Sequence, residues 1–572
     1  MSATLIPPTD DANWPSVPTT NADDQITLEI IASAITATAD EMFVALRKTA
    51  VSSIIYEVLD MGTAVLDRDG ALASSGAGIP AFVGVLDKSC AAVIRAFPGD
   101  RVHEGDIFFT SDPYHGGVTH LNDIVVLMPV FIEDELIAWV ANIAHNSDVG
   151  GIAPGSSSGD ATEIFQEGIR IPPIKVVEAG RTVQQVFDIL RLNSRLPDAL
   201  HGDLWAQIAS VRTGELRLRE VADRYGADTF RNAMQHYIDY GEKVSLAALA
   251  DLPKGTFELT EEIDDGRVLH CAITITDDEF IVDLTNNPEQ STAPTNTTRD
   301  AAAIPVQMVF KSLTDASFMA NAGTFKPIRL VTEPGTVFDP IEPAPMGFYY
   351  DLLLPLYDLL WRCVAQVAPE RLGAGHFASV CATFVAGTHP DTGRPYSIIE
   401  PQIGGWGART DGDGNSAMFS GVHGETYNCP AEINEARNGL LVRRLALNEA
   451  DGGEGEFTGG RGIVTEYELR AEDGSATLAF TRSKYPPWAL DGGEAGSPNY
   501  CEIIRPGDAT EPERLSFAAG VPTEPGDVIR IVTGNGGGVG DPKRRDRAQV
   551  ARDVRDGLVS PERAAEIYGF DG

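Results

Sequence analysis

Two long apolar runs separated by a pair of acidic residues constrain the fold of this chain more than any other feature. The runs are IVVLMPVFI at 124–132 and ELIAWVANIAH at 135–145, and Glu133 and Asp134 lie between them. Apolar segments of strand length joined by two polar residues are typical of a β-hairpin, in which the arms pair antiparallel. The sequence therefore predicts that the two outer ends of these arms lie side by side.

The register of the hairpin decides which polar residues meet at its open end. With the two acidic residues as the turn, Asp123 lies opposite Ala144. Asn122 then lies opposite His145. Pro129 interrupts the first arm and lacks the N–H that a central strand donates, so this arm is predicted to be an edge strand or a bulged strand. A bulge would slip the register by one residue, and in either register His145 lies close to Asp123.

The loops at this end hold the densest group of chemically active side chains, in SDPYHGGVTHLND (111–123) and AHNSDVGGIAPGS (144–156). The hairpin brings His120, Asp123 and His145 together. Two imidazoles and one carboxylate bind a divalent ion such as zinc, manganese or iron, and leave positions open for water or substrate. The alternative is a set of hydrogen-bonded loop residues. We favour a metal site because three of the ten histidines fall in these segments beside Gly-Gly pairs.

Two more residues of these loops are candidates for catalysis. Asp148 is predicted to orient a ligand or to accept a proton from water, and His115 is ranked below it, as a support for the metal ligands or an exposed residue. Glu167 and Arg170, in QEGIR, could bind a polar substrate or a subunit edge. A structural ion pair between them is an equal alternative.

Two glycine-rich motifs resemble a serine-hydrolase motif and a nucleotide-binding motif, but neither fits its pattern fully. GSSSG (155–159) has the spacing of a serine-hydrolase elbow around Ser157, but loop residues flank it on both sides where a strand and a helix are needed. TGNGGGVGDP (533–542) departs from the dinucleotide-binding pattern at Val539, and no Gly-Lys pair supports a phosphate-binding loop. We expect a tight loop packed on other backbone there, and no nucleotide site on this chain.

The order of elements favours an α+β fold, with mixed layers and a β-rich, Gly-rich C-terminal part. Helical spacing indicates helices within 26–52, 182–250, 301–313 and 351–368, and short β runs occupy 256–286. The predicted parts are a flexible N-terminal arm at 1–24, a metal-site part at 25–250, a middle α+β part at 251–376, and a β-rich part with small terminal helices at 377–572.

Charge and cysteine usage exclude several classes of protein. The 44 basic and 83 acidic residues give a net charge of −39, which disfavours binding to nucleic acid or to an anionic membrane. The longest apolar run is too short to span a bilayer, and the N-terminus lacks the pattern of a signal peptide. Six cysteines without a CxxC pair indicate neither a disulfide framework nor a zinc ribbon. We therefore expect a cytoplasmic protein.

Taken together, the motifs resemble those of the hydantoinase B/oxoprolinase family across nearly the whole chain. The resemblance rests on the two loop segments above together with IFQEGIRIPP, NAGTFKPIRL, NCPAEINE, FTGGRGIVTEYEL and GNGGGVGDPKRRD, which occur in family order. It implies a subunit of an ATP-dependent enzyme that opens lactam or hydantoin rings. A separate hydantoinase A-type subunit would carry ATP and magnesium and phosphorylate the substrate, in a heterotetramer or larger heteromer.

The resemblance also implies site residues and alternatives. The divalent metal of the related acetone carboxylase subunit maps onto His120, Asp123 and His145. Phe82 stands where many family hydrolases have a histidine, and the stretch that holds Glu57 and Asp60 departs from the usual pattern, so the substrate class is open. A cyclic amide hydrolase is favoured. An ATP-dependent ketone carboxylase of the acetone or acetophenone type and a non-catalytic scaffold subunit are the alternatives.

Overall fold

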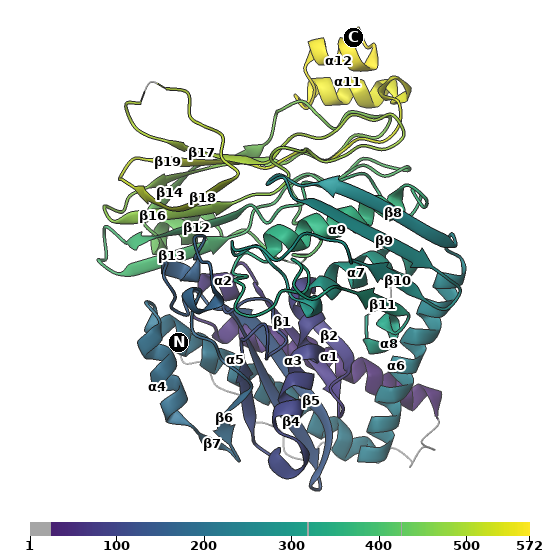
Figure 1. The fold of residues 1–572 in the computed structure, drawn as a ribbon, viewed down its shortest axis with the longest axis vertical. Coiled ribbons are helices and arrows are strands. Elements are labelled where there is room, and N and C mark those ends of the chain that lie inside the picture. The colour runs from purple at the N-terminus through teal and green to yellow at the C-terminus, as the bar shows by residue number, and fades with distance from the viewer. Residues whose placement is uncertain (1–23, 317–319, 425, 509, 572) are drawn as a thin grey trace, which may run out of the picture.

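The computed structural model describes residues 24–316, 320–424, 426–508 and 510–571, which form four β-sheets with helices packed between and around them (Figure 1). The sheets are antiparallel except for one parallel pair, β10 with β11. The predicted α+β class is confirmed. The predicted N-terminal arm lies outside the described residues, apart from Asp24, which precedes the first helix.

The hairpin forms the centre of a seven-stranded sheet. In spatial order its strands are β2 (Leu72–Gly78), β1 (Met61–Asp67), β5 (Glu135–His145), β4 (Asp123–Ile132), β3 (Ile107–Thr110), β6 (Ile174–Glu178) and β7 (Arg181–Thr182). One face packs on helices α1 (Gln25–Thr49), α4 (Gln184–Asn193), α5 (Pro197–Tyr225) and α6 (Ala227–Ala250). The other face packs on α3 (Pro80–Ala96). Because both faces are buried, the two arms read as continuous apolar runs rather than alternating ones.

A bulge sets the register of the hairpin. Glu133 and Asp134 form the turn, both with positive φ, and Ile132 pairs with Glu135 as predicted. Between Val130 and Phe131 the pairing then shifts by one residue. As a result Asp123 lies opposite His145, which corrects the pairing with Ala144 that an unbulged hairpin predicts.

Pro129 is not on an edge strand, which corrects that half of the prediction. β4 lies between β5 and β3, but β3 is short and its pairing with β4 ends at Leu127. Pro129 therefore lies beyond the part of β4 that β3 covers, and its missing N–H leaves no gap in a ladder on that side.

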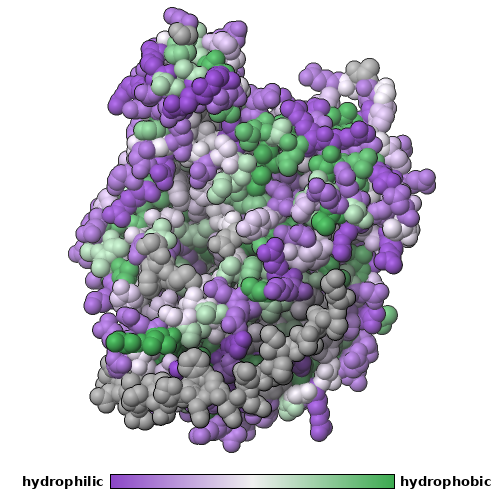
Figure 2. Space-filling view, turned by 180° about the vertical axis from the view of Figure 1, so that it is seen from behind, coloured by the Kyte–Doolittle hydropathy of each residue, from purple (hydrophilic) through white to green (hydrophobic). Residues whose placement is uncertain are grey.

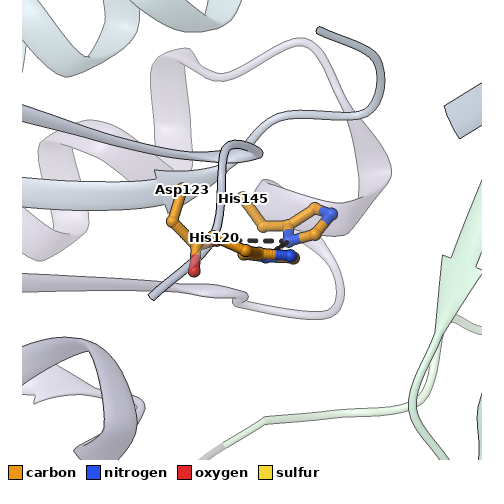
Figure 3. Close-up of side chains that lie close together, drawn as sticks. All are labelled: His120, Asp123 and His145. Atoms are coloured by element: carbon orange, nitrogen blue, oxygen red, sulfur yellow. Dashed lines mark hydrogen bonds and ion pairs between the residues drawn. The ribbon is translucent and has the colours of Figure 1, made fainter. Parts of the chain in front are cut away.

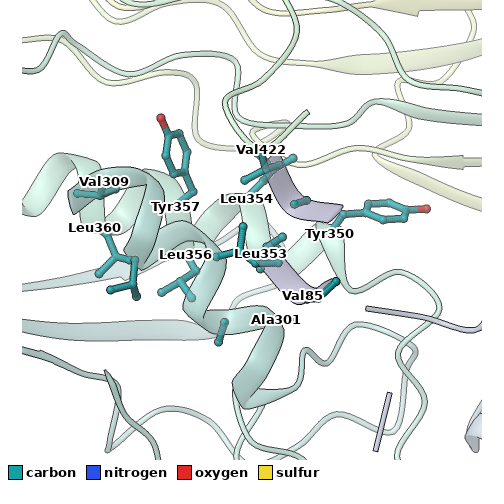
Figure 4. Close-up of a cluster of buried hydrophobic side chains, with 14 of the residues drawn as sticks. Val85, Ala301, Val309, Tyr350, Leu353, Leu354, Leu356, Tyr357, Leu360 and Val422 are labelled. Carbon is teal, nitrogen blue, oxygen red and sulfur yellow. The ribbon is translucent and has the colours of Figure 1, made fainter. Parts of the chain in front are cut away.

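The middle of the chain builds a four-stranded sheet and two buried helices. The strands are β11 (Ile328–Val331), β10 (Phe280–Asp283), β9 (Val268–Ile275) and β8 (Gly255–Glu262) in spatial order, and the helices are α7 (Arg299–Thr314) and α9 (Tyr350–Ala365). Short helix α8 (Ala322–Phe325) packs against this core, and short helix α2 (Ser53–Tyr56) belongs to a separate apolar cluster. Nearly every side chain of α9 is buried, and α9 packs on α7, β8 and β9 in the largest apolar cluster, which side chains of α3 such as Val85 also join (Figure 4).

Two four-stranded sheets form the C-terminal part. One holds β13 (Pro395–Glu400), β12 (Ala382–Thr388), β16 (Gly474–Ala479) and β18 (Phe517–Thr523); the other holds β14 (Leu440–Leu447), β15 (Ile463–Leu469), β19 (Val528–Val532) and β17 (Tyr500–Ile504). Helix α10 (Ala431–Arg437) precedes β14. The glycine-rich loop after β19 packs on other backbone, and a Cβ at Gly536 or Gly537 would clash with the carbonyls of Trp406 and Trp488.

The last two helices, α11 (Arg547–Arg555) and α12 (Pro561–Tyr568), close the chain around a small apolar cluster of their own. They project from the rest of the molecule and carry mainly hydrophilic side chains on the face seen in Figure 2. Across the described part of the chain, none of the helices combines the length and the apolar character needed to cross a bilayer. All six cysteines are buried and free of disulfides.

Candidate metal centre

The predicted triad converges where β4 begins and β5 ends (Figure 3). Asp123 is the first residue of β4, His145 is the last of β5, and the two residues are paired directly. His120 lies in a turn that the N–H of Asp123 closes by donating to the His120 carbonyl at 3.2 Å. All three side chains are buried. The convergence predicted from the hairpin is confirmed, and the binding of a metal ion stays a prediction.

Three ligand atoms of the triad form a nearly equilateral triangle. His120 Nε2 and His145 Nδ1 each lie 3.2 Å from Asp123 Oδ1, and the two nitrogens lie 3.3 Å apart. Two atoms that each bind one ion at about 2.1 Å lie roughly 3.0 Å apart at a right angle and roughly 3.4 Å apart at the tetrahedral angle. The observed spacings fall between these values, so the three atoms fit three ligands of one divalent ion.

Hydrogen bonds to residues outside the triad leave these three atoms available, and His120 Nε2 and His145 Nδ1 lie within hydrogen-bond distance of each other. His120 Nδ1 donates to the carbonyl of Gly347 at 3.0 Å, and because a carbonyl can only accept, Nε2 keeps its lone pair. The Thr119 hydroxyl donates to Asp123 Oδ2, which leaves Oδ1 for the site. Asp123 Oδ1 has no hydrogen-bond partner among the described residues, although both rings are near it. The donor set therefore fits an ion held between the three side chains.

The electrostatics of the triad favour an anionic carboxylate between two imidazoles. Burial opposes the charge on Asp123, but the two rings outweigh it, and the pKa of Asp123 lies well below its usual value. Burial also lowers the pKa of His145. For His120 the attraction of Asp123 outweighs burial and raises the pKa. A buried carboxylate of this kind is stable only with a cation or protonated donors beside it.

A cavity of about 30 Å³ adjoins the triad, roughly the space of one water molecule. Its lining includes, besides His120 and His145, the side chains of Asp60, Phe82, Tyr349 and His423. Asp60 Oδ1 is buried with no hydrogen-bond partner among the described residues, and burial together with nearby Asp123 raises the pKa of Asp60 well above its usual range. Asp60 is therefore a candidate to supply a further ligand to a bound ion or to hold a proton beside the triad.

Two residues of this cavity, Asp60 and His423, are not among the metal ligands or catalytic residues predicted from the sequence. Asp60 directly precedes β1, and its carbonyl accepts the N–H of His145 at 3.0 Å because β1 pairs with β5. That neighbourhood depends on strand order, which local sequence does not show. His423 reaches the cavity from a loop almost 300 residues further along, and burial lowers its pKa to about 4. No spacing in the sequence links it to the triad.

Asp148 does not join the triad. Its carboxylate accepts the backbone N–H groups of Gly150, Gly155 and Arg195 at 2.9 to 3.1 Å, and pairs with the Arg195 guanidinium at 3.1 Å. Both oxygens are thus engaged in holding the loop that follows β5. The structure gives Asp148 a role in shaping this loop, which differs from the predicted contact with water or ligand.

The remaining candidates lie apart from the cavity. His115 is largely exposed and contacts Glu342 at 3.1 Å, and Arg170 pairs with Asp112 and Glu342 rather than with Glu167. Glu167 is buried and accepts the N–H of Gly347 at 2.6 Å, and the carbonyl of the same glycine orients His120. Burial raises the pKa of Glu167 to about 7. Glu167 therefore supports the triad indirectly, through the backbone of Gly347.

Known proteins resemble this chain along nearly its whole length. The β subunit of caprolactamase from Pseudomonas jessenii is 30% identical over 96% of this chain and 96% of that protein. The crystal structure of the ATP-dependent caprolactamase from the same organism superposes with a TM-score of 0.90 at 29% identity, covering 96% of both chains. 5-Oxoprolinase 1 of Arabidopsis thaliana is 27% identical over 91% of this chain, which matches 42% of that protein.

A more distant structure shares the fold. A nucleotide-free structure of acetone carboxylase has a TM-score of 0.85 at 20% identity and covers 96% of this chain and 80% of that chain. The family described as hydantoinase B/oxoprolinase matches residues 24–542, which include both arms of the hairpin, the cavity and the glycine-rich loop. With most of its length matched by this family and the same fold as its solved relative, the chain belongs to the hydantoinase B/oxoprolinase family.

Proposed function

We propose that this chain is the metal-bearing subunit of an ATP-dependent cyclic amide hydrolase. The observation that carries the proposal is the buried triangle of His120 Nε2, His145 Nδ1 and Asp123 Oδ1, with edges of 3.2 to 3.3 Å, beside a cavity with room for a water molecule. The kinship with caprolactamase supports a lactam or hydantoin as the substrate class. Zinc, manganese and iron all suit this donor set.

The residues around the cavity have separable tasks. When bound, a divalent ion supplies a Lewis acid that polarises a substrate oxygen and acidifies water. His120, Asp123 and His145 would hold the ion, and the Gly347 carbonyl and the Thr119 hydroxyl fix the His120 ring and the Asp123 carboxylate. Asp60, beside the same cavity, is placed to take a proton from water.

A partner subunit completes the proposed enzyme. An unstrained amide is a poor electrophile, and phosphorylation of its oxygen by ATP would create a good leaving group. The sequence holds no nucleotide motif, and the caprolactamase relative is described as a β subunit, so we assign ATP and magnesium to a hydantoinase A-type partner. We propose a heterotetramer or larger heteromer as the assembly. The unpaired cysteines support a location in the cytoplasm.

One observation favours a second candidate function. Phe82, which replaces a histidine of many family hydrolases, lines the cavity together with Phe384 and several aliphatic residues. An apolar wall suits a ketone as well as a lactam. ATP-dependent carboxylation of a ketone is therefore the alternative, and the same triad would serve it.

The test is activity of the full chain, co-expressed with its partner, on lactams, hydantoins and ketones with and without ATP. We expect about one divalent ion per chain, ATP-dependent ring opening, and loss of both ion and turnover by at least about 100-fold in His145→Ala. The exposed His236→Ala is the matched control and keeps both.

Other outcomes contradict the proposal in distinct ways. Incorporation of labelled bicarbonate into a ketone product would establish the carboxylase instead. Full turnover in His145→Ala would leave only a scaffold role for the triad. A purified chain that stays free of divalent ions after metal-replete growth would remove both enzymatic readings.

A further inference from the structure

A second pocket lies where the middle of the chain meets the C-terminal sheets. It has a volume of about 500 Å³, within the range of small-molecule sites. Its lining combines polar residues after β8 with Phe480 and Phe517 of the C-terminal part and with Asp351, in the first turn of α9. Neither the metal triad nor Asp60 lines this pocket.

A chain of aromatic rings in contact lies between this pocket and the metal cavity. Phe517 lines the pocket, whereas Phe384 and Tyr350 line the cavity. The ring of Phe348 contacts all three, with centroid distances of 5.9 Å to Phe517, 5.8 Å to Phe384 and 5.6 Å to Tyr350. Asp351 directly follows Tyr350. Contacts between these rings therefore connect the pocket to the wall of the metal cavity.

Asp351 is the one charged residue of the pocket lining whose carboxylate has an unpartnered buried oxygen among the described residues. Asp351 is nine-tenths buried, and its Oδ1 has no hydrogen-bond partner there. By contrast Arg267 pairs with Asp265, Arg482 pairs with Glu261 and Asp358, and Asp264 accepts backbone N–H groups. A buried polar atom without a partner is costly unless a ligand or water completes it.

The protonation state of the Asp351 carboxyl group determines which kind of ligand group it can bind. Burial raises the pKa of Asp351 to about 7, so its neutral form is well populated at neutral pH. A neutral carboxyl group presents one O–H donor beside one carbonyl acceptor. The amide of a small ring is fixed in the cis form, which presents an N–H donor beside a carbonyl acceptor in the complementary order, and the two groups join through a pair of hydrogen bonds.

We propose that this pocket binds the cyclic amide substrate through Asp351 before the substrate reaches the metal cavity, from which the rings of Phe517, Phe348 and Phe384 separate it. The proposal rests on the function proposed above, because it names the recognition site for that substrate class. Asp351 forms hydrogen bonds with the N–H and the carbonyl of the ring amide. Phe480 and Phe517 contact the apolar part of the substrate ring. A ring amide that carries a methyl group on nitrogen would lose the donor and clash with the acceptor.

The test measures binding of ε-caprolactam and N-methyl-ε-caprolactam to the metal-loaded full chain by calorimetry. We expect ε-caprolactam to bind at least about tenfold more tightly than its N-methyl derivative, because a buried acceptor is left unpaired in the latter. Asp351→Leu should weaken binding of ε-caprolactam by about tenfold or more. Asp351→Asn should keep most of it, since a carboxamide offers the same donor and acceptor.

Controls separate this proposal from the loss of the fold or of the metal. Asp277→Leu, at a largely exposed carboxylate, should bind ε-caprolactam like the parent. Metal content should stay unchanged in both Asp351 variants. With the partner and ATP present, Asp351→Leu should raise KM more than it lowers kcat, which a merely structural change would not do.

The outcomes distinguish failure of this proposal from failure of the proposed function. Equal binding of the two lactams, or equal loss in Asp351→Asn and Asp351→Leu, would overturn recognition of the amide by a donor and acceptor pair. Unchanged KM in Asp351→Leu, with normal ATP-dependent turnover of the parent, would overturn the pocket alone. Binding that depends on Asp351 without any turnover would support the pocket and contradict the hydrolase.

Discussion

At the scale of single residues, the proposed centre depends on backbone carbonyls and one hydroxyl as much as on its three ligands. The carbonyl of Gly347 sets the tautomer of His120, and the Thr119 hydroxyl leaves one Asp123 oxygen free. The carbonyl of Asp60 binds the backbone of His145. The ligands are thus held in place before an ion arrives, which lowers the entropic cost of binding it.

Asp351 should make stability depend on pH. Its folded pKa of about 7 lies above its usual value, so the folded state binds the proton more tightly than the unfolded state. Its contribution is complete below about pH 4 and is lost as pH rises to about 7. Between pH 5 and pH 8, urea unfolding should show Asp351→Asn gaining stability relative to the parent by up to the order of 3 kcal/mol.

The pH dependence of the stability difference between the parent and Asp351→Asn tests this prediction. A stability difference between parent and Asp351→Asn that stays constant from pH 5 to pH 8 would mean that Asp351 is ionised in the folded chain across this range. Asp277→Asn, at the largely exposed carboxylate used above as a control, should show no such trend.

At the scale of elements, the β4–β5 hairpin positions the centre, and its turn is strained. Glu133 and Asp134 have φ values of 48° and 68°, a conformation that favours Asn and Gly. Replacing the pair by Asn-Gly should therefore raise the free energy of unfolding by about 0.5–1 kcal/mol. Urea unfolding measures the change, and metal content should stay constant. Destabilisation by the same replacement would mean that the acidic side chains themselves hold the turn.

Local sequence patterns predict most of the helices and strands, because each of these elements depends on the spacing of residues within one segment. The helical spacing at 26–52 and 182–250 corresponds to α1 and to α4, α5 and α6. Helix α3 was not predicted. Pro80 begins it and Gly84 interrupts its apolar spacing, and that glycine lets α3 approach Ile304 of α7 closely. Close packing between helices is a tertiary requirement that a propensity scale does not contain.

Only those site residues that the β4–β5 hairpin brings together could be predicted from the sequence. His120, Asp123 and His145 belong to one hairpin, and either register brings them near one another. Pro129 predicts a bulge or an edge strand, so the sequence allows the register that pairs Asp123 with His145 but does not choose it. The contact of Asp60 with the triad depends on strand order, and His423 reaches the cavity from a distant loop, so local sequence patterns predict neither contact. Asp148 and His115, the two residues predicted to be catalytic from their proximity in sequence, do not line the cavity.

At the scale of the whole molecule, a buried ion-pair cluster ties the middle of the chain to its C-terminal part. Arg482 pairs with Glu261 of β8 at 2.7 Å and with Asp358 of α9, which also accepts the indole N–H of Trp488. The pair is nearly inaccessible to solvent, so it is scarcely screened. The cluster fixes the walls of the pocket that contains Asp351, because Arg482 lines that pocket.

Removing one partner of this cluster should be strongly destabilising. Arg482→Ala leaves Asp358 buried without its cation and should lower the free energy of unfolding by about 3–5 kcal/mol. Arg409→Ala, at an exposed pair with Asp411, should cost less than about 1 kcal/mol. Urea midpoints of the two variants give the comparison. Equal effects would show that the cluster contributes no more than a surface pair.

The centre is walled in on every side that the described chain provides: the exposed fractions of His120, Asp123 and His145 are 5%, 0% and 4%. An ion that reaches such a place leaves slowly, since its departure waits for the surrounding helices and strands to part. For the metal site that we propose, we therefore expect the element bound to reflect the ions available during folding more than the later composition of the surroundings. Cells that differ in their supply of manganese or iron would then contain the same protein with different metal ions bound.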